Sequence, residues 1–457
     1  TYIAELLYLT STLYFQSAAV PGRRNSISQP AQSPVRYVPL KQNIFMKHSI
    51  YMTTLAIALT FCDLLHAQTI DNKIVIGAID SIQSTILNEQ RKLWVYVPNS
   101  GSANADSQQK YPVIYLLDGE NHFNSVTGMA EYLSNTMIIP EMIIVGIPNT
   151  NRFRDLSPTK PSESTFPLPP FVGGGEAFTS FLEKELMPYI ESKYPTAPYR
   201  LMIGHSLGGL MVINTMLHHC NLFNSYLAID PSLWWDNDLM VKQADSIFQQ
   251  KKFDGKSLYI AMANNGITEG MDLTSVMKDT TEESANSRPM LLFSDVLESR
   301  KTYGLRWKFH YYPDDNHGSV TMIAAYDALR FFFDKYTIPL SYFYNAPKPS
   351  FNADSVIITH FKTASEQMGY TVLPPENFVH EEAYNMMYNN DLDRAFRLFD
   401  LNISNYPSSY NAYDSMGDYY MAKNDKEKAI IYFTKALELK EVPATRKKLE
   451  ELKTNDK

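Results

Sequence analysis

A serine between two glycines, Gly204-His-Ser206-Leu-Gly208, separates an apolar segment typical of a buried strand from one typical of a helix. The strand-like segment covers residues 199–205 and the helix-like segment covers residues 207–217. A strand that turns sharply into a helix is crowded, so side chains at positions 204 and 208 would collide with neighbouring backbone. Such a turn holds a serine hydroxyl above the sheet, near the positive end of the helix. Ser206 is therefore the candidate nucleophile.

Apolar runs of strand length alternate with helical patterns through the middle of the chain. The runs are Val113–Leu117, Met142–Ile147, Leu201–Ile203, Tyr226–Ile229, Leu258–Met262 and Arg306–Tyr312. Helical patterns are clearest at 176–193, 207–218 and 322–336, and residues 75–97 read as an antiparallel edge pair. This alternation predicts a mostly parallel sheet covered on both faces, with the chemistry in loops that follow the strands. Together with the G-x-S-x-G turn, it predicts an α/β-hydrolase domain over residues 70–340.

The last hundred residues have a different pattern. A Pro-rich link follows Tyr336, and small and aromatic residues then recur 34 positions apart, Ala395 with Ala429 and Phe399 with Phe433. This is the tetratricopeptide period, in which two antiparallel helices touch through small residues. We expect a small all-α tetratricopeptide-like domain over residues 350–457. It should pack on the hydrolase domain, aided by a helix near 354–367, and could recruit a protein partner.

The first 67 residues predict export. Residues 46–67 have a basic start, an apolar run too short for a membrane span and a Leu65-His-Ala67 end, which indicates a signal peptide cleaved after Ala67. Cys62 would be the site of lipidation, but Phe61 before it is bulky for that signal. Residues 1–45 precede this start and are read as an upstream or expression-tag segment without a fold. We expect no membrane span in the mature chain.

Charge and cysteine content bound the partners and the compartment. Without residues 1–67 the chain keeps 36 Lys and Arg against 47 Asp and Glu, a net charge of −11. No basic patch stands out, so a nucleic-acid partner is not expected. Only Cys220 remains, so no intrachain disulfide can form. Export without disulfides favours a bacterial periplasm or cell surface.

A serine nucleophile needs a base, and His317 is the candidate. It follows the last strand in a polar loop, Pro313-Asp-Asp-Asn-His317, where the chain order of these hydrolases places the base. The other histidines downstream of Ser206 fall within helical or strand segments. They are His218, His219, His310, His360 and His380.

The acid that orients the base is open at this point. The loop after the strand at 258–262 offers Glu269 and Asp272, of which Asp272 is preferred. Asp230 is an alternative, but Pro231 follows it directly and favours a structural turn. Asp314 and Asp315 near His317 read as a strand-terminating turn.

The oxyanion hole should use two backbone N–H groups. One belongs to Leu207, after the nucleophile. The other comes from the loop after the strand at 113–117, where Gly119 lets the backbone turn and Glu120 offers its N–H.

Several further motifs resemble the Putative esterase family, which includes esterase D, enterochelin and ferri-bacillibactin esterases and feruloyl esterase domains. The motifs are Leu87-Asn-Glu-x-Arg91, Tyr115-Leu-Leu-Asp-Gly-Glu120, Gly146-Ile-x-Asn149, Arg152-Phe-Arg-Asp-Leu-Ser-Pro158, Gly204-His-Ser-Leu-Gly-Gly209 and Asp230-Pro-Ser-Leu-Trp-Trp235. The resemblance covers residues 70–340. It implies carboxyl-ester hydrolysis by Ser206 and His317, without a metal or organic cofactor. The chain departs from it at Ala263-Asn-Asn265, where many relatives have Gly-x-x-Glu, so the acid stays undecided.

The substrate is only outlined by the residues. Arg152, Arg154, Trp234 and Trp235 follow strand ends and could form an aromatic and cationic rim for a phenolic acid or catecholate. Arginine and aspartate this close in sequence also often only fix a loop, and tryptophans often only pack. The resemblance leaves a siderophore lactone, a phenolic or acyl ester, and a polysaccharide-linked ester as candidate substrates. The alternatives are an acyltransferase of the same fold, or a repeat-mediated binding protein whose hydrolase fold is idle.

Overall fold

The computed structural model describes residues 74–98, 109–162, 167–265, 267, 272–299, 304–339 and 352–454. The expected upstream segment, the signal peptide, Cys62 and Glu269 lie outside these ranges. Residues Val75–Lys457 form one compact unit. Within the described ranges, we find no helix that combines the length and the hydrophobicity of a membrane span.

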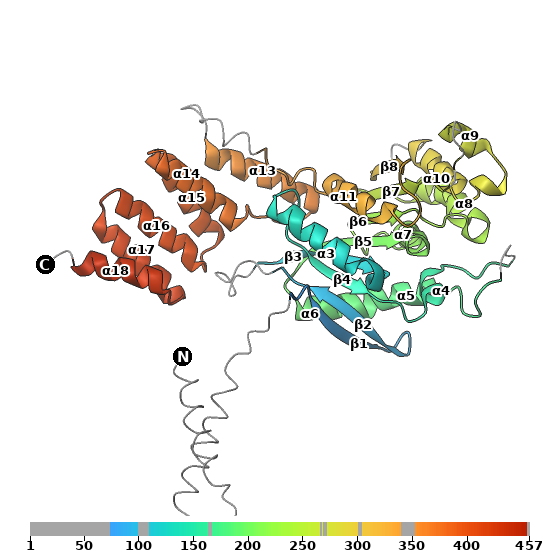
Figure 1. Cartoon of the computed structure of the whole chain (residues 1–457), viewed down its shortest axis with the longest axis horizontal. Helices are drawn as coiled ribbons and strands as arrows, with labels where there is room; N and C mark the ends of the chain where they lie inside the picture. The colour runs from blue at the N-terminus through green and yellow to red at the C-terminus, as the bar shows by residue number, and fades with distance from the viewer. Residues whose placement is uncertain are drawn as a thin grey trace, which may run out of the picture. The chain divides into compact units, whose positions relative to one another are not determined.

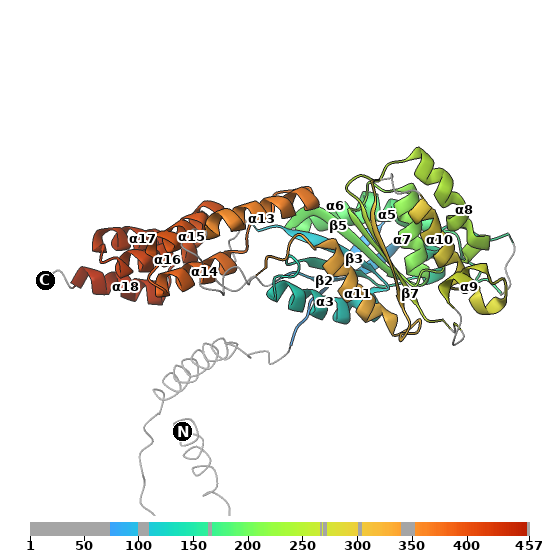
Figure 2. The ribbon, with the colours of Figure 1, turned by 90° about the horizontal axis from the view of Figure 1, so that it is seen from above.

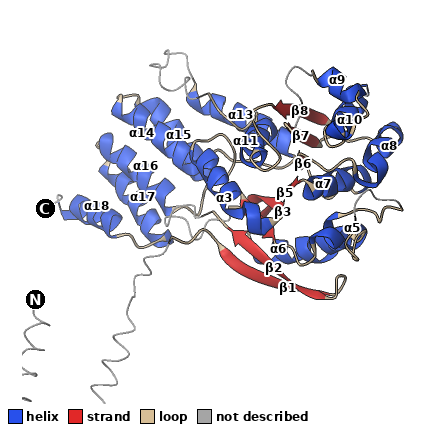
Figure 3. Cartoon of the chain, turned by 45° about the vertical axis from the view of Figure 1, so that its right-hand side comes forward, coloured by secondary structure: helices blue, strands red, loops and turns tan. Residues whose placement is uncertain are grey.

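An eight-stranded sheet, drawn in red in Figure 3, forms the centre of the unit. Its strand order is β1-β2-β4-β3-β5-β6-β7-β8. The strands are β1 (Ala78–Ser84), β2 (Glu89–Tyr96), β3 (Tyr111–Leu117), β4 (Ile143–Ile147), β5 (Thr196–His205), β6 (Ser225–Ile229), β7 (Ser257–Ala263) and β8 (Arg306–Tyr312). β1 and β2 form an antiparallel pair, and β2 joins β4 antiparallel. All pairings from β4 through β3 to β8 are parallel. The mostly parallel sheet predicted from the sequence is confirmed.

Helices cover both faces of the sheet, as Figures 1 and 2 show. Side chains alternate between the faces along each strand, so Ile114 and Leu116 of β3 join one core and Val113 and Tyr115 join the other. The first core contains α3 (Gly119–Asn135) and α11 (Val320–Phe332). The second contains α5 (Gly175–Phe181), α6 (Met187–Lys193), α7 (Leu207–His218), α8 (Trp235–Gln250) and α10 (Arg288–Ser299). The shorter elements are α4 (Arg152–Leu156), the π-helical turn Leu182–Leu186, α9 (Leu273–Lys278) and the 3₁₀ turn Glu282–Ser284.

The C-terminal part is a succession of helices. They are α13 (Ala353–Met368), α14 (Glu376–Tyr388), α15 (Leu392–Asn405), α16 (Tyr410–Ala422), α17 (Lys426–Leu439) and α18 (Pro443–Thr454). A Cβ on Gly417 of α16 would lie 2.5 Å from the Phe433 ring of α17, so the small residue lets these two helices touch. This is the packing that the 34-residue spacing predicts. The assignment to the tetratricopeptide family, and the domain boundaries at 340 and 350, stay predictions.

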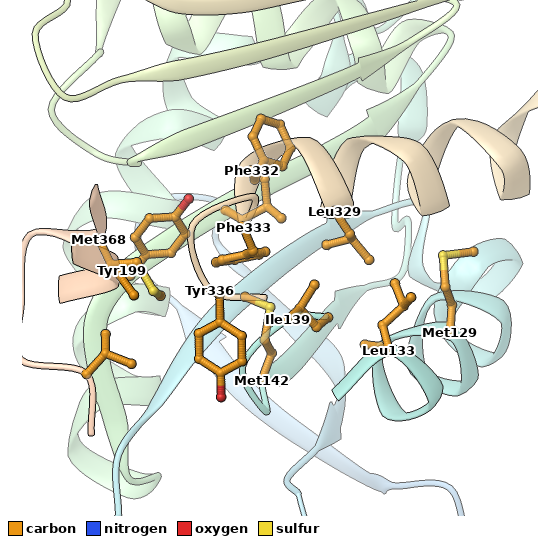
Figure 4. Packing of buried hydrophobic residues seen from close by; sticks show 14 of the residues in the cluster. Met129, Leu133, Ile139, Met142, Tyr199, Leu329, Phe332, Phe333, Tyr336 and Met368 are labelled. Carbon is orange, nitrogen blue, oxygen red and sulfur yellow. The ribbon is translucent and has the colours of Figure 1, made fainter. Parts of the chain in front are cut away.

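The first helix of this part, α13, shares a hydrophobic core with the sheet. Tyr336 lies after α11, and its ring meets that of Phe361 on α13 at 5.5 Å and 89°. The His360 side chain bonds through Nε2 to the Tyr336 carbonyl at 2.9 Å. Figure 4 shows Met368 of α13 in the same hydrophobic core as Tyr199, Phe333 and Tyr336. The expected helix near 354–367 therefore exists and packs on the hydrolase part.

Candidate active site

Ser206 lies between the last residue of β5 and the first residue of α7. Its backbone φ is 60° and ψ is −117°, a combination that costs energy for a residue with a side chain. The turn is held by Ser206 N–H, which donates to the Ile229 carbonyl at 2.9 Å. A Cβ on Gly204 would collide with the Gly208 carbonyl oxygen, so only glycine fits at position 204. A Cβ on Gly208 would lie 3.1 Å from Asp118 Oδ2, so that position is also tight. The expected strand–turn–helix context of Ser206 is present.

His317 lies in the loop between β8 and α11, and its imidazole meets Asp230. The Nδ1–H donates to Asp230 Oδ2 at 2.5 Å. Asp230 directly follows β6 and is 3% exposed. Its carboxylate also accepts from Ala263 N–H at 2.9 Å and from the Asn265 side-chain amide at 2.9 Å. Because Nδ1 holds the proton in this pair, Nε2 is the basic nitrogen of His317.

The surroundings of Asp230 favour its ionised form. Burial raises the pKa of this carboxyl, but the hydrogen bonds from His317, Ala263 and Asn265 outweigh it and bring the pKa below its usual value. Asp230 therefore faces His317 as a carboxylate.

The preference for Asp272 as the partner of His317 is corrected by this geometry. Asp272 is the N-cap of α9, where its Oδ1 accepts from Ser275 N–H at 2.7 Å. That cap lowers the pKa of Asp272 on an exposed surface. The loop after β7, expected to supply a carboxylate to His317, instead supplies the Asn265 side-chain amide, which donates to Asp230. Pro231 after Asp230 predicts a structural turn, and the backbone does turn there, since Asp230 has φ 43°. The same turn carries the acid, and the signal that identifies it is a carboxylate at the end of β6, the strand beside β5.

His205 brings the base loop close to the nucleophile. Its Nε2–H donates to the His317 carbonyl at 2.8 Å, and the centroids of the two rings are 4.4 Å apart. Burial, followed by the nearby charge of His317, lowers the pKa of His205 to about 4. His205 is therefore a neutral donor at ordinary pH. Ser206 Oγ lies 3.4 Å from Ser232 Oγ, and hydrogen bonds between nucleophile and base often tighten only when substrate binds.

Both expected oxyanion donors lie at helix starts. Leu207 is the first residue of α7 and Gly119 is the first residue of α3, with Glu120 next. N–H groups in a first helical turn have no partner within the helix and attract negative charge. A Cβ on Gly119 would lie 2.6 Å from the Ile147 nitrogen, so only glycine fits where α3 leaves the sheet. Because β3 and β5 are neighbouring parallel strands, their exits bring these donors to the same edge.

The residues expected to form a cationic and aromatic rim are largely engaged in packing and ion pairs. Arg152 forks onto Asp118, with Nε and Nη2 at 2.7 and 2.9 Å from its two oxygens. Arg154 is paired with Glu89 and Asp155. Trp235 is 2% exposed, and its Nε1–H donates to the Thr159 carbonyl at 3.2 Å. Trp234 is half-buried beside it, at a ring distance of 6.0 Å. The structure therefore places Arg152 and Arg154 as loop-fixing cations and Trp235 in the core.

Metal-ligating side chains do not gather in the described ranges: no three or more His, Cys, Asp or Glu residues there are arranged to hold a metal ion. Cys220 is a free thiol.

Comparisons with known proteins agree with this fold. Residues 84–284 match the family described as Putative esterase. The chain is 29% identical over 264 residues to ferri-bacillibactin esterase BesA of Bacillus subtilis. The aligned region covers 53% of this chain and 86% of that protein. An IroE-like serine hydrolase from Shewanella oneidensis superposes with a TM-score of 0.60 and 31% identity, over 71% of this chain and 98% of that one. An uncharacterised protein from Capnocytophaga ochracea superposes with a TM-score of 0.53 and 19% identity, over 82% of this chain and 99% of its own. The predicted α/β-hydrolase fold is confirmed.

Proposed function

Because this chain belongs to the Putative esterase family and is a carboxylic ester hydrolase, we propose that it acts as a serine esterase through an acyl-enzyme on Ser206. The observation that carries the proposal is the strained Ser206 turn together with His317, whose imidazole is hydrogen-bonded to the buried carboxylate of Asp230. A nucleophile, a base and an orienting carboxylate come from the ends of β5, β8 and β6, which meet at one edge of the sheet.

The mechanism follows from these groups. His317 Nε2 takes the Ser206 proton as Oγ attacks the ester carbonyl, and the Leu207 and Glu120 N–H groups stabilise the oxyanion. The tetrahedral intermediate collapses with loss of the alkoxide, which receives the proton from His317. Water then adds to the acyl-enzyme with His317 again as base, and collapse releases the acid and restores Ser206. Throughout, Asp230 keeps the Nδ1–H tautomer and stabilises the imidazolium that forms.

The substrate is proposed as a class only. Ferri-bacillibactin esterase BesA is the named relative on the sequence side, which favours a siderophore lactone. A phenolic or acyl ester, free or linked to polysaccharide, is the other candidate. Arg152 and Arg154 are bonded to carboxylates, which speaks against a rim built to hold a polyanion through them.

The setting of the enzyme is also a proposal. The signal-like residues 46–67 and the single mature cysteine support an exported protein of a bacterial periplasm or cell surface. The C-terminal helices could hold a protein partner. A net charge of −11 without residues 1–67 speaks against nucleic acid.

The test is turnover of p-nitrophenyl acetate by the full chain, beside Ser206→Ala and, as a control, Ser192→Ala on the exposed surface of α6. We expect Ser206→Ala to lower kcat by at least about a thousandfold and Ser192→Ala to leave it unchanged. A fluorophosphonate should add its mass to a peptide that contains Ser206. Activity that survives in Ser206→Ala contradicts the proposal.

Two alternatives give different results in the same assays. An acyltransferase would deliver the acyl group to an added alcohol in preference to water. A repeat-mediated binding protein with an idle hydrolase fold would turn over no ester and take up no fluorophosphonate.

A further inference from the structure

Arg152 joins three elements that meet around the nucleophile. Its Nε donates to Asp118 Oδ1 at 2.7 Å, and its Nη2 donates to Asp118 Oδ2 at 2.9 Å. The same Nη2 donates to the carbonyl of His205, the residue before Ser206, at 3.3 Å. Arg152 is the first residue of α4, Asp118 lies between β3 and α3, and His205 ends β5. One guanidinium therefore connects the oxyanion loop to the nucleophile turn.

The carboxylate on the other side of this pair is buried and fixed from several directions. Asp118 is 2% exposed and has φ 51° and ψ 44°. Its Oδ1 also accepts from the Asn149 side-chain amide at 2.6 Å. A Cβ on Gly208 would lie 3.1 Å from Asp118 Oδ2, so the carboxylate rests against the first turn of α7. Asp118 directly precedes Gly119 and Glu120 at the start of α3, the loop that the proposed mechanism uses for the oxyanion.

These contacts do not suit a substrate-binding arginine. The Nε–Nη2 edge of the guanidinium, which would fork onto an anionic ligand, is already bonded to Asp118, and a buried carboxylate offers a stronger partner than a solvated ligand does. A planar fork with fixed donor directions suits the holding of two backbone segments at a set spacing.

We propose that Arg152 is a positioning residue that sets the spacing between the oxyanion loop at 118–120 and the Ser206 turn, through Asp118 and the His205 carbonyl. The inference rests on the serine mechanism proposed above. Loss of the fork lets the Glu120 N–H drift from the Leu207 N–H, which weakens the hold on the oxyanion and leaves ground-state binding in place. Loss of the Arg152 contacts should therefore lower kcat and leave KM nearly unchanged.

The test uses the full chain and p-nitrophenyl acetate, a small neutral ester with no anionic group for an arginine to bind. Arg152→Lys keeps the charge and loses the fork. We expect kcat to fall about 10- to 100-fold, below the loss that follows removal of a whole oxyanion donor, with KM within about threefold. Arg152→Ala should lose more, and added guanidinium ion should restore part of its kcat.

Arg200→Lys is the matched control. Arg200 lies on the same strand β5, where its Nε donates to Glu191 Oε1 at 2.9 Å, away from the nucleophile turn. It should keep kcat, and circular dichroism should show the same fold in all variants. If Arg152→Lys does not fold, Asp118→Asn takes its place, with the same expected loss in kcat and unchanged KM.

Two results overturn the positioning role. One is a normal kcat for Arg152→Lys with KM raised only for a catecholate lactone, which would make Arg152 a substrate contact. The other is an equal loss in Arg200→Lys. Either result beside an inactive Ser206→Ala leaves the serine mechanism standing, whereas activity in Ser206→Ala contradicts that mechanism itself.

Discussion

Replacement of Asp230 with asparagine removes the negative charge beside His317 and keeps the volume of the side chain. The carboxylate is 3% exposed, and its Oδ1 accepts from Ala263 N–H at 2.9 Å. An asparagine would keep its carbonyl oxygen toward that N–H, so its amide nitrogen would face His317 Nδ1. His317 would then accept at Nδ1 and carry its proton on Nε2, which is the wrong tautomer for a base toward Ser206.

The expected loss of kcat is large because the replacement gives His317 the wrong tautomer, although the side chain at position 230 still fits its site. The same replacement in a serine–histidine–aspartate triad lowers kcat by about 10⁴, which corresponds to about 5 kcal/mol of transition-state stabilisation. We expect Asp230→Asn to lower kcat on p-nitrophenyl acetate by about 10³ to 10⁴, with little change in KM.

Asp272→Asn is the matched control, since asparagine caps a helix about as well as aspartate does. We expect its kcat to stay within about twofold of the unchanged protein. Glu269→Gln completes the panel because sequence reasoning left Glu269 open as the acid. A kcat above a tenth of the unchanged value in Asp230→Asn would contradict this role of Asp230, as would a thousandfold loss in Asp272→Asn or Glu269→Gln instead.

Two further predictions concern stability. The pKa of His205 falls from 6.5 to about 4 in the folded chain, so only the unfolded chain takes up a proton between these values. The contribution of His205 to the free energy of unfolding is therefore complete above about pH 6.5 and is lost as the pH falls toward 4. His205→Gln keeps a donor for the His317 carbonyl but removes the titrating group. Between pH 7 and pH 4 the free energy of unfolding, measured by urea titration, should therefore decline by about 3 kcal/mol less in this variant than in the unchanged protein. Equal declines in the two proteins would contradict this. Phe361 is 2% exposed, and its ring packs against that of Tyr336. Phe361→Ala should therefore lower the free energy of unfolding by about 3 to 5 kcal/mol. Its esterase activity should be lost at a lower urea concentration, and an unchanged midpoint would show that α13 does not support the hydrolase part.

The C-terminal helices illustrate how far local pattern reaches. The 34-residue spacing predicts helices that touch through small residues, and the structure packs Gly417 of α16 against the Phe433 ring of α17. The same spacing is silent on what the first helix contacts. The core shared by Tyr336, Phe361 and Met368 arises because residues far apart in sequence bury apolar surface together.

The sequence by itself determined the parts of the site that are written locally. The glycines around Ser206, the apolar runs of the parallel sheet and the polar loop of His317 are each visible within a few residues, because strand, helix and turn preferences act over that range. Only the tertiary structure decided which carboxylate meets His317 and what Arg152 holds. Asp230 and Asp272 both follow a strand of the same sheet, and a carboxylate reaches the base only if the fold places it across neighbouring strands at hydrogen-bond distance. Arg152 lies 34 residues from Asp118 and 53 from His205, and no local preference specifies a bond across such separations.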